Sequence, residues 1–284
     1  MFLWGGSFVL SKQLLIDFNP ITINFIRCVI ASIIFVGFCI IIFKKEFIIV
    51  KKDLKYFIGM AFFEPFVYFL FETYSLKYND ASVVSVIIAT IPLFVALMAV
   101  FIFKERLSKL NFLGIILSIS GIVIMLWHNF VEAEFNFYIF LAFGAVFSTI
   151  GYNYFLRKIP KTYSPIVVIT WQNIFGIIFF LPLVFVVNSS TSAAFQFHAL
   201  GNIQNLSFIL ILSIFCSTIA FILYIGSMRV LGLARTNIFV NLIPVMTVII
   251  AFYILKEEIT IYKILGIFIV ISGIFLVQYK RKNS

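Results

Sequence analysis

The chain has 284 residues, of which 63% are hydrophobic and only 11% are charged, and its mean hydropathy is +1.16. A water-soluble globular protein normally carries about 25% charged residues, so this composition excludes a soluble enzyme or binding domain and indicates a protein solvated by the lipid bilayer. The net charge of +10 does not indicate nucleic-acid binding, because the basic residues are divided among short segments between apolar runs.

Apolar runs separated by polar breaks predict about ten transmembrane helices, since about 20 apolar residues cross a hydrocarbon core. In chain order, we expect helices at residues 1–16, 21–43, 54–76, 82–103, 110–127, 136–156, 164–187, 206–228, 234–255 and 261–279. The first run lacks the basic start and small-residue cleavage site of a signal peptide, so we expect an uncleaved first helix. The fold class expected is therefore an all-α membrane protein.

The distribution of Lys and Arg predicts the orientation in the membrane. If the N-terminus is cytoplasmic, most of the 21 basic residues fall in inner loops or at inner helix ends. The positive-inside rule then places both termini in the cytoplasm and requires an even number of spans. We expect a multi-pass protein of the cell (inner) membrane.

The chain repeats itself at a fixed spacing, which predicts two related halves at residues 1–130 and 131–284. A shift of 152 positions pairs Lys77 with Arg229, Pro92 with Pro244, Lys104-Glu105 with Lys256-Glu257, Gly114 with Gly266, and Ser120-Gly121 with Ser272-Gly273. A shift of 145 pairs Lys12 with Arg157 and Pro20 with Pro165 nearer the start of each half. Because each repeat has five helices, an odd number, the two halves are expected to be inverted in the membrane.

Several of these features resemble the EamA family of the drug/metabolite transporter superfamily. They are Trp4-Gly5-Gly6-Ser7 with Lys12, Arg27, the Tyr74 to Ser82 turn, and the two blocks that run from Pro through Lys-Glu to two Gly residues. The resemblance covers nearly the whole chain. It implies a central cavity between the halves and export of a small-molecule substrate such as an amino acid, a metabolite or a drug, without naming the substrate.

The expected third helix carries two acidic residues. Glu64, Tyr68 and Glu72 have i, i+4, i+8 spacing, which places them on one face of an α-helix. A carboxylate that faces lipid is costly, so this face should meet a cavity or a partner. Arg27 lies at matching depth, and we expect it to form a gating or structural ion pair with Glu72, with simple packing as the alternative. Glu64 then remains to bind substrate or a proton.

The acidic residues belong to one half only. The 152-residue shift places Cys216, Ala220 and Tyr224 opposite Glu64, Tyr68 and Glu72. An element required to fold both halves should recur in both. The asymmetry therefore favours a task at the site over a role in folding.

Four further polar side chains are candidates for binding substrate or a proton: Trp171, Gln172, Asn237 and Asn241. The 145-residue shift places Gln172 opposite Arg27. Hydrogen bonding between helices, worth about 0.6 kcal/mol for each pair, is the alternative explanation for each of them.

Pro92 and Pro244 are expected to kink the fourth and ninth helices, because proline removes a backbone hydrogen bond. Small residues on the fifth and tenth helices predict close helix packing, inside the chain or between subunits, so a homodimer is considered. These small residues are Gly114, Ser118, Gly121, Gly266 and Gly273.

Sequence motifs for other functions are not found. The chain has no Gly-rich phosphate loop, no His-Glu-x-x-His or Gly-x-Ser-x-Gly motif, and no cysteine pair at metal spacing. We therefore expect a secondary transporter working by alternating access, and no enzyme, cofactor or metal site. A passive facilitator and a non-transporting membrane sensor or partner protein are the alternatives.

Overall fold

The computed structural model describes residues 1–43, 46–94, 109–131, 136–190, 199–231 and 239–278. This part of the chain forms ten helical units and contains no strand. Five helices are long and apolar enough to cross a membrane, at Pro20–Ile42, Leu54–Tyr78, Ile139–Lys158, Pro165–Val187 and Ile203–Val230. The expected all-α membrane fold is confirmed.

The helices begin and end within about four residues of the expected positions wherever both ends are described. They are α1 (Phe2–Leu14), α2 (Pro20–Ile42), α3 (Leu54–Ala61), η1 (Phe62–Val67), α4 (Tyr68–Tyr78), α5 (Ala81–Ile88), α7 (Lys109–Val131), α8 (Ile139–Lys158), α9 (Pro165–Ser190), α11 (Ile203–Ile211), η2 (Leu212–Ile219), α12 (Ala220–Leu231), η3 (Phe239–Asn241), α14 (Leu242–Ile254) and α15 (Ile261–Gln278). The segments η1 and η2 are π-helical, and η3 is a 3₁₀ turn.

Capping residues explain where two of the helices start. The Asn19 side chain accepts a hydrogen bond from the backbone N–H of Ile21 at 3.0 Å, and Pro20 occupies the first position of α2. Asn202 accepts from the N–H of Gln204 at 2.9 Å at the start of α11. Asparagine before the first turn and proline at its start are the residue types that favour helix initiation.

The expected third helix is broken in its middle. Glu64 has φ −147° and ψ 118°, which are not helical angles, and the next residue is Pro65, joined to it by a cis peptide bond. Proline lacks an N–H and disfavours the helical conformation in the residue before it. The expected helix is therefore divided into three segments, α3, η1 and α4.

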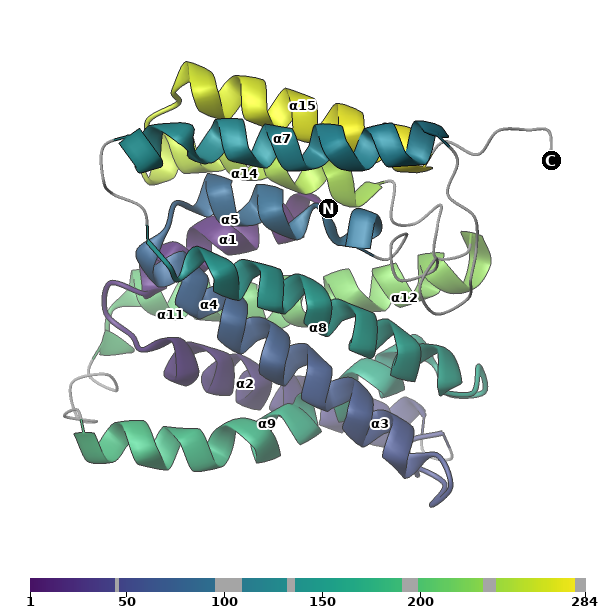
Figure 1. Cartoon of the computed structure of the whole chain (residues 1–284). Coiled ribbons are helices and arrows are strands. Elements are labelled where there is room, and N and C mark those ends of the chain that lie inside the picture. Colours follow the sequence, from purple (N-terminus) through teal and green to yellow (C-terminus); the bar gives the residue numbers. More distant parts are fainter. Residues whose placement is uncertain (44–45, 95–108, 132–135, 191–198, 232–238, 279–284) are drawn as a thin grey trace.

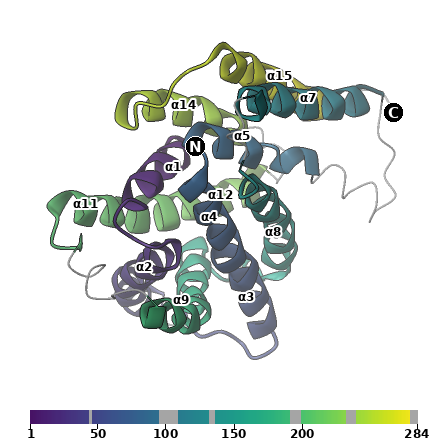
Figure 2. The same ribbon diagram turned by 60° about the vertical axis from the view of Figure 1, so that its left-hand side comes forward.

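Helices far apart in the sequence pack in pairs. α7 lies beside α15 and α2 beside α9, at opposite sides of the molecule (Figures 1 and 2). Between these two pairs, α1 packs on α14, and α5 packs on α8, which also contacts α3 and α4. The centre of the bundle thus combines helices from both ends of the chain.

Glycines bring α7 and α15 into close contact. A Cβ on Gly266 would lie 2.7 Å from the carbonyl oxygen of Gly121, and a Cβ on Gly273 would lie 2.6 Å from that of Gly114. Only glycine permits this approach of two backbones. The expected small-residue faces therefore meet each other inside the chain.

Large apolar side chains cover outer faces of the bundle. Ile33 of α2, Val230 of α12 and Phe268 of α15 are each more than 70% exposed. Exposed apolar surface on this scale marks a membrane or partner contact. Together with the apolar helices, it fits an environment of lipid.

The turn between α4 and α5 is held by a residue from the far end of the chain. The Glu257 carboxylate accepts hydrogen bonds from the N–H of Ala81 at 2.7 Å and the N–H of Ser82 at 3.3 Å, and from the Ser82 hydroxyl at 2.6 Å. It therefore satisfies free N–H groups at the start of α5, where the helix dipole also favours an anion.

Two lysines hold the same turn. Lys263 forms an ion pair with Asp80 at 2.5 Å, and Lys12 donates to the carbonyls of Leu76 and Asn79 at 2.8 and 2.7 Å. We refer to these groups together as the turn cluster, defined by Lys12, Asp80, Ser82, Glu257 and Lys263. It connects the end of α1, the α4–α5 turn and the segment between α14 and α15.

Candidate functional site

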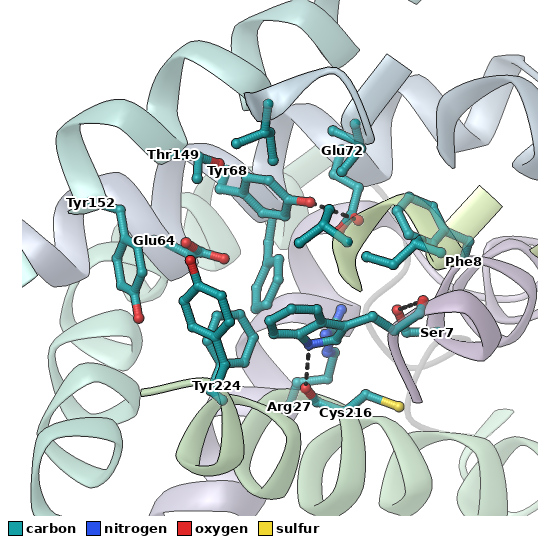
Figure 3. Close-up of a pocket in the computed structure, with 17 residues that line it drawn as sticks. Ser7, Phe8, Arg27, Glu64, Tyr68, Glu72, Thr149, Tyr152, Cys216 and Tyr224 are labelled. Atoms are coloured by element: carbon teal, nitrogen blue, oxygen red, sulfur yellow. Dashed lines mark hydrogen bonds between the residues drawn. The ribbon is translucent and has the colours of Figure 1, made fainter. Parts of the chain in front are cut away.

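A cavity of about 60 Å³ lies in the middle of the bundle (Figure 3). Its lining comes from α1, α2, η1, α4, α5, α8, η2, α12, η3, α14 and residue 91. Most of the lining is aromatic or aliphatic. The charged side chains among the described lining residues are Arg27, Glu64 and Glu72.

Glu64 reaches the cavity because η1 interrupts the helix. Its side chain is 5% exposed, and within the described residues its carboxylate has no hydrogen bond or ion pair. Ser148 of α8 donates to the carbonyl of Phe63 at 2.6 Å, which fixes the backbone beside Glu64. Figure 3 shows the carboxylate close to the Tyr152 ring and to the hydroxyl end of Tyr224. Glu64 is thus a buried carboxylate that faces the cavity and has no partner in the part of the chain that the structure describes.

Arg27 faces the opposite part of the cavity and is held from several sides. Its Nε and Nη2 donate to the Ser217 hydroxyl at 3.1 and 2.9 Å, and Nη1 lies 3.5 Å from the Asn24 side-chain oxygen. The guanidinium also lies 4.2 Å from the centre of the Phe69 ring, a cation–π contact. Three of its five N–H donors are therefore directed to protein acceptors.

Glu72 lies near Arg27 but does not contact it directly. The Tyr68 hydroxyl donates to the Glu72 carboxylate at 3.4 Å. Arg27 and Glu72 attract each other electrostatically, yet the guanidinium hydrogen bonds go to Ser217 and Asn24 in this structure. The two expected partners therefore both line the cavity. They interact electrostatically, without a direct ion pair.

Glu64, Tyr68 and Glu72 were expected to lie on one face of a continuous α-helix, and the structure differs from this expectation at Glu64. Glu64, Tyr68 and Glu72 all line the cavity, but Glu64 has non-helical backbone angles. Pro65 causes this break, so the spacing of an ideal α-helix applies from Tyr68 to Glu72 and fails between Glu64 and Tyr68.

Trp171 and Gln172 of α9 are not among the residues that line the cavity. The Trp171 ring nitrogen donates to the carbonyl of Phe47 at 2.8 Å, and the two rings stack. Gln172 is 2% exposed, and its side-chain oxygen has no partner within the described residues. Asn237 and the side chain of Asn241 lie outside the described residues.

The two prolines lie beside breaks at the cavity wall. α5 ends at Ile88, and the chain is helical again at residues 91–94, so Pro92 lies in a first helical turn. Pro244 lies in the first turn of α14, directly after η3. Ile88 and Ile91 line the cavity, as do Val240 and Ile243 at the corresponding positions of the second break.

Ser217 and Asn24 were not selected from the sequence. Both bind Arg27, and Asn24 precedes it by one helical turn on α2, so its proximity could have been inferred from spacing. Ser217 is 190 residues away, and no local signal connects it to Arg27. Trp4 also lines the cavity, with its ring nitrogen donating to the carbonyl of Cys216 at 3.2 Å.

Comparison with known proteins gives consistent relatives along the whole chain. The chain is 23% identical to the uncharacterized transporter YetK of Bacillus subtilis, covering 98% of this chain and 84% of YetK. It is 26% identical to an uncharacterized transporter of Archaeoglobus fulgidus, with 98% and 95% covered. It is also 23% identical to the WAT1-related protein At3g02690, chloroplastic, of Arabidopsis thaliana, with 100% and 68% covered.

The fold is shared with solved structures, among them a crystal structure of a protein. It aligns with a TM-score of 0.58 at 14% identity, covering 96% of this chain and 92% of that chain. A sequence profile described as the EamA-like transporter family matches residues 1–127 and again residues 136–279. The apolar helices make the chain an integral membrane protein. Because the profile covers almost all of the sequence, the chain belongs to the EamA-like transporter family.

Proposed function

We propose that the chain is a secondary transporter that exports small organic solutes across the cell membrane, with the cavity around Glu64 as the solute site. The observation that carries this proposal is the buried Glu64 carboxylate, which faces the cavity and has no partner among the described residues. Ionisable side chains within membrane helices usually mark a pathway or binding site, because their burial is costly.

Alternating access fits the size of the cavity. A volume of about 60 Å³ holds a few water molecules, whereas pockets for drug-sized ligands are several times larger. A solute can therefore enter only if the surrounding helices separate. The breaks beside Pro92 and Pro244 border the cavity, and we propose that they are the points at which the helices bend.

The packing pattern supports an inverted repeat. The π-helical segments η1 and η2 fall at corresponding positions under the 152-residue shift. α1 packs on α14 as α8 packs on α5, and α2 and α9 occupy corresponding places in the two halves. We propose that the halves are inverted repeats, with both termini in the cytoplasm as the basic residues predict.

Transport by purified protein in liposomes tests this function. Efflux and uptake should be measured for a panel of amino acids, amines, organic acids and drugs, with and without a pH gradient. We expect flux of at least one solute, and loss of that flux in Glu64→Gln. Glu258→Gln is the matched control, because Glu258 is exposed and does not line the cavity.

The outcomes separate the alternatives. A solute flux that ignores the pH gradient would favour a passive facilitator over a proton-coupled transporter. Absence of protein-dependent flux for the whole panel would contradict transport and favour a membrane sensor or partner protein.

A further inference from the structure

The described wall of the cavity carries more acidic than basic side chains. Among the described lining residues, two carboxylates and one guanidinium are present. Arg27 and Glu72 attract each other electrostatically, and Tyr68 also donates to Glu72. Glu64 is left as the carboxyl group without a compensating partner among the described residues. Burial disfavours the charged form of such a group, and a bound cation would offset that cost.

The surroundings of Glu64 favour a ligand that donates hydrogen bonds. Tyr152 is 1% exposed, and its hydroxyl has no partner within the described residues. Figure 3 shows the Tyr152 ring on one side of the Glu64 carboxylate and the Tyr224 hydroxyl end directly next to that carboxylate. Carboxylate and phenol oxygens can both accept hydrogen bonds from an ammonium group, which has up to three N–H donors.

The basic side chain in the described wall of the cavity is already engaged by protein groups. It is Arg27, and three of its five N–H donors are directed to Ser217 and Asn24. The other walls include Phe8, Phe69 and Phe221, which suit an apolar body.

We propose that this site selects small primary amines, with the ammonium group at Glu64 and Tyr152 and a short apolar body against the aromatic walls. A free amino acid carries a carboxylate that would have to compete with the existing partners of Arg27, so it is a poorer ligand. The inference rests on the proposed function, because it names the class of solute for the same cavity.

Three compounds with the same branched apolar body test the selection. 3-Methylbutylamine carries only the ammonium group, 4-methylpentanoate carries only the carboxylate, and leucine carries both. Binding to the purified protein in lipid nanodiscs should be measured by calorimetry. We expect the amine to bind at least about tenfold more tightly than the acid or leucine, a factor that corresponds to about 1.4 kcal/mol.

Two variants locate the ammonium group. Glu64→Gln keeps the shape of the side chain and should weaken amine binding at least about tenfold. Tyr152→Phe removes a hydroxyl that has no partner within the described segments and should weaken amine binding by severalfold. Glu258→Gln should leave amine binding unchanged. The comparison of the three compounds on the unaltered protein needs no variant, so it stands even if Glu64→Gln fails to fold.

Each result decides the inference separately from the function. Leucine or 4-methylpentanoate binding as tightly as the amine would overturn it, as would an amine affinity unchanged in a folded Glu64→Gln, or no binding at all. If flux is found in liposomes for other solutes, transport stands while the amine site falls. If the amine binds as expected but no solute moves, the amine site stands and the transport proposal falls.

Discussion

Glu64 and Glu257 both lie where distant segments of the chain meet, yet their surroundings differ in kind. Glu257 accepts three hydrogen bonds at the start of α5 and belongs to the turn cluster. Glu64 faces the cavity and has no partner among the described residues. A satisfied carboxylate stabilises the structure that satisfies it, whereas an unsatisfied one costs stability. The contrast indicates a structural role for the turn cluster and supports the proposed binding role of the cavity.

The largest expected effect is the loss of transport in Glu64→Gln. We expect flux of the transported solute to fall by about two orders of magnitude or more, since a charge pair lost from a buried site costs several kcal/mol. The unfolding temperature should be equal or higher, because the substitution removes a buried ionisable group that has no partner among the described residues. Flux in liposomes and a thermal unfolding curve check the two parts. A lower unfolding temperature with normal flux would reverse the contrast.

Glu257→Gln should produce the opposite combination. The substitution removes the charge and one of the two carboxylate acceptors at the start of α5, so we expect a loss of about 2 kcal/mol in the free energy of unfolding. Flux for each folded molecule should be retained. Denaturant unfolding in detergent, followed by flux normalised to folded protein, measures both quantities. Unchanged stability would show that the turn cluster does not hold the α4–α5 turn.

Ser217→Ala probes the fixed charge inside the cavity. Two guanidinium nitrogens of Arg27 would lose their common acceptor, so we expect the free energy of unfolding to fall by about 1.5 kcal/mol. Flux should change less than in Glu64→Gln, since we propose a structural role for Arg27 and a solute-binding role for Glu64. If Ser217→Ala abolished flux without loss of stability, Arg27 would have to be counted as a solute-binding residue.

Lys263→Met should have the smallest effect. The Asp80 side chain is 41% exposed, so water weakens its ion pair with Lys263, and we expect a loss of about 0.5 kcal/mol. High salt should reduce the stability difference between the two proteins. A loss as large as that of Glu257→Gln would mean that the turn cluster depends on its ion pair more than on the capping of α5.

The sequence was sufficient to predict the helices, because long apolar runs have few alternatives in a membrane. It also identified Pro92 and Pro244, which lie beside breaks in the structure. The break at Glu64 was missed, although Pro65 follows it directly and proline disfavours a helical preceding residue. Pro65 is therefore the signal in the sequence that ideal helical spacing does not extend to Glu64.

Contacts between distant segments could not be predicted from the sequence in the same way. The acceptor for Arg27 is the hydroxyl of Ser217, and Glu257 caps a helix that begins at Ala81. Each contact depends on how the helices pack, and no local pattern encodes it. Gln172 is a second example. It matches Arg27 in the sequence repeat, yet it is not among the residues that line the cavity.

The most direct measurement of the role of Glu64 is the thermal stabilisation of the protein by a solute that it transports. A ligand at about 100 times its dissociation constant stabilises the folded state by about 2.7 kcal/mol. We predict a clear rise in unfolding temperature for the unaltered protein and for Glu257→Gln, and no rise for Glu64→Gln. An equal rise in Glu64→Gln would place the solute away from this carboxylate and contradict the assignment of the cavity.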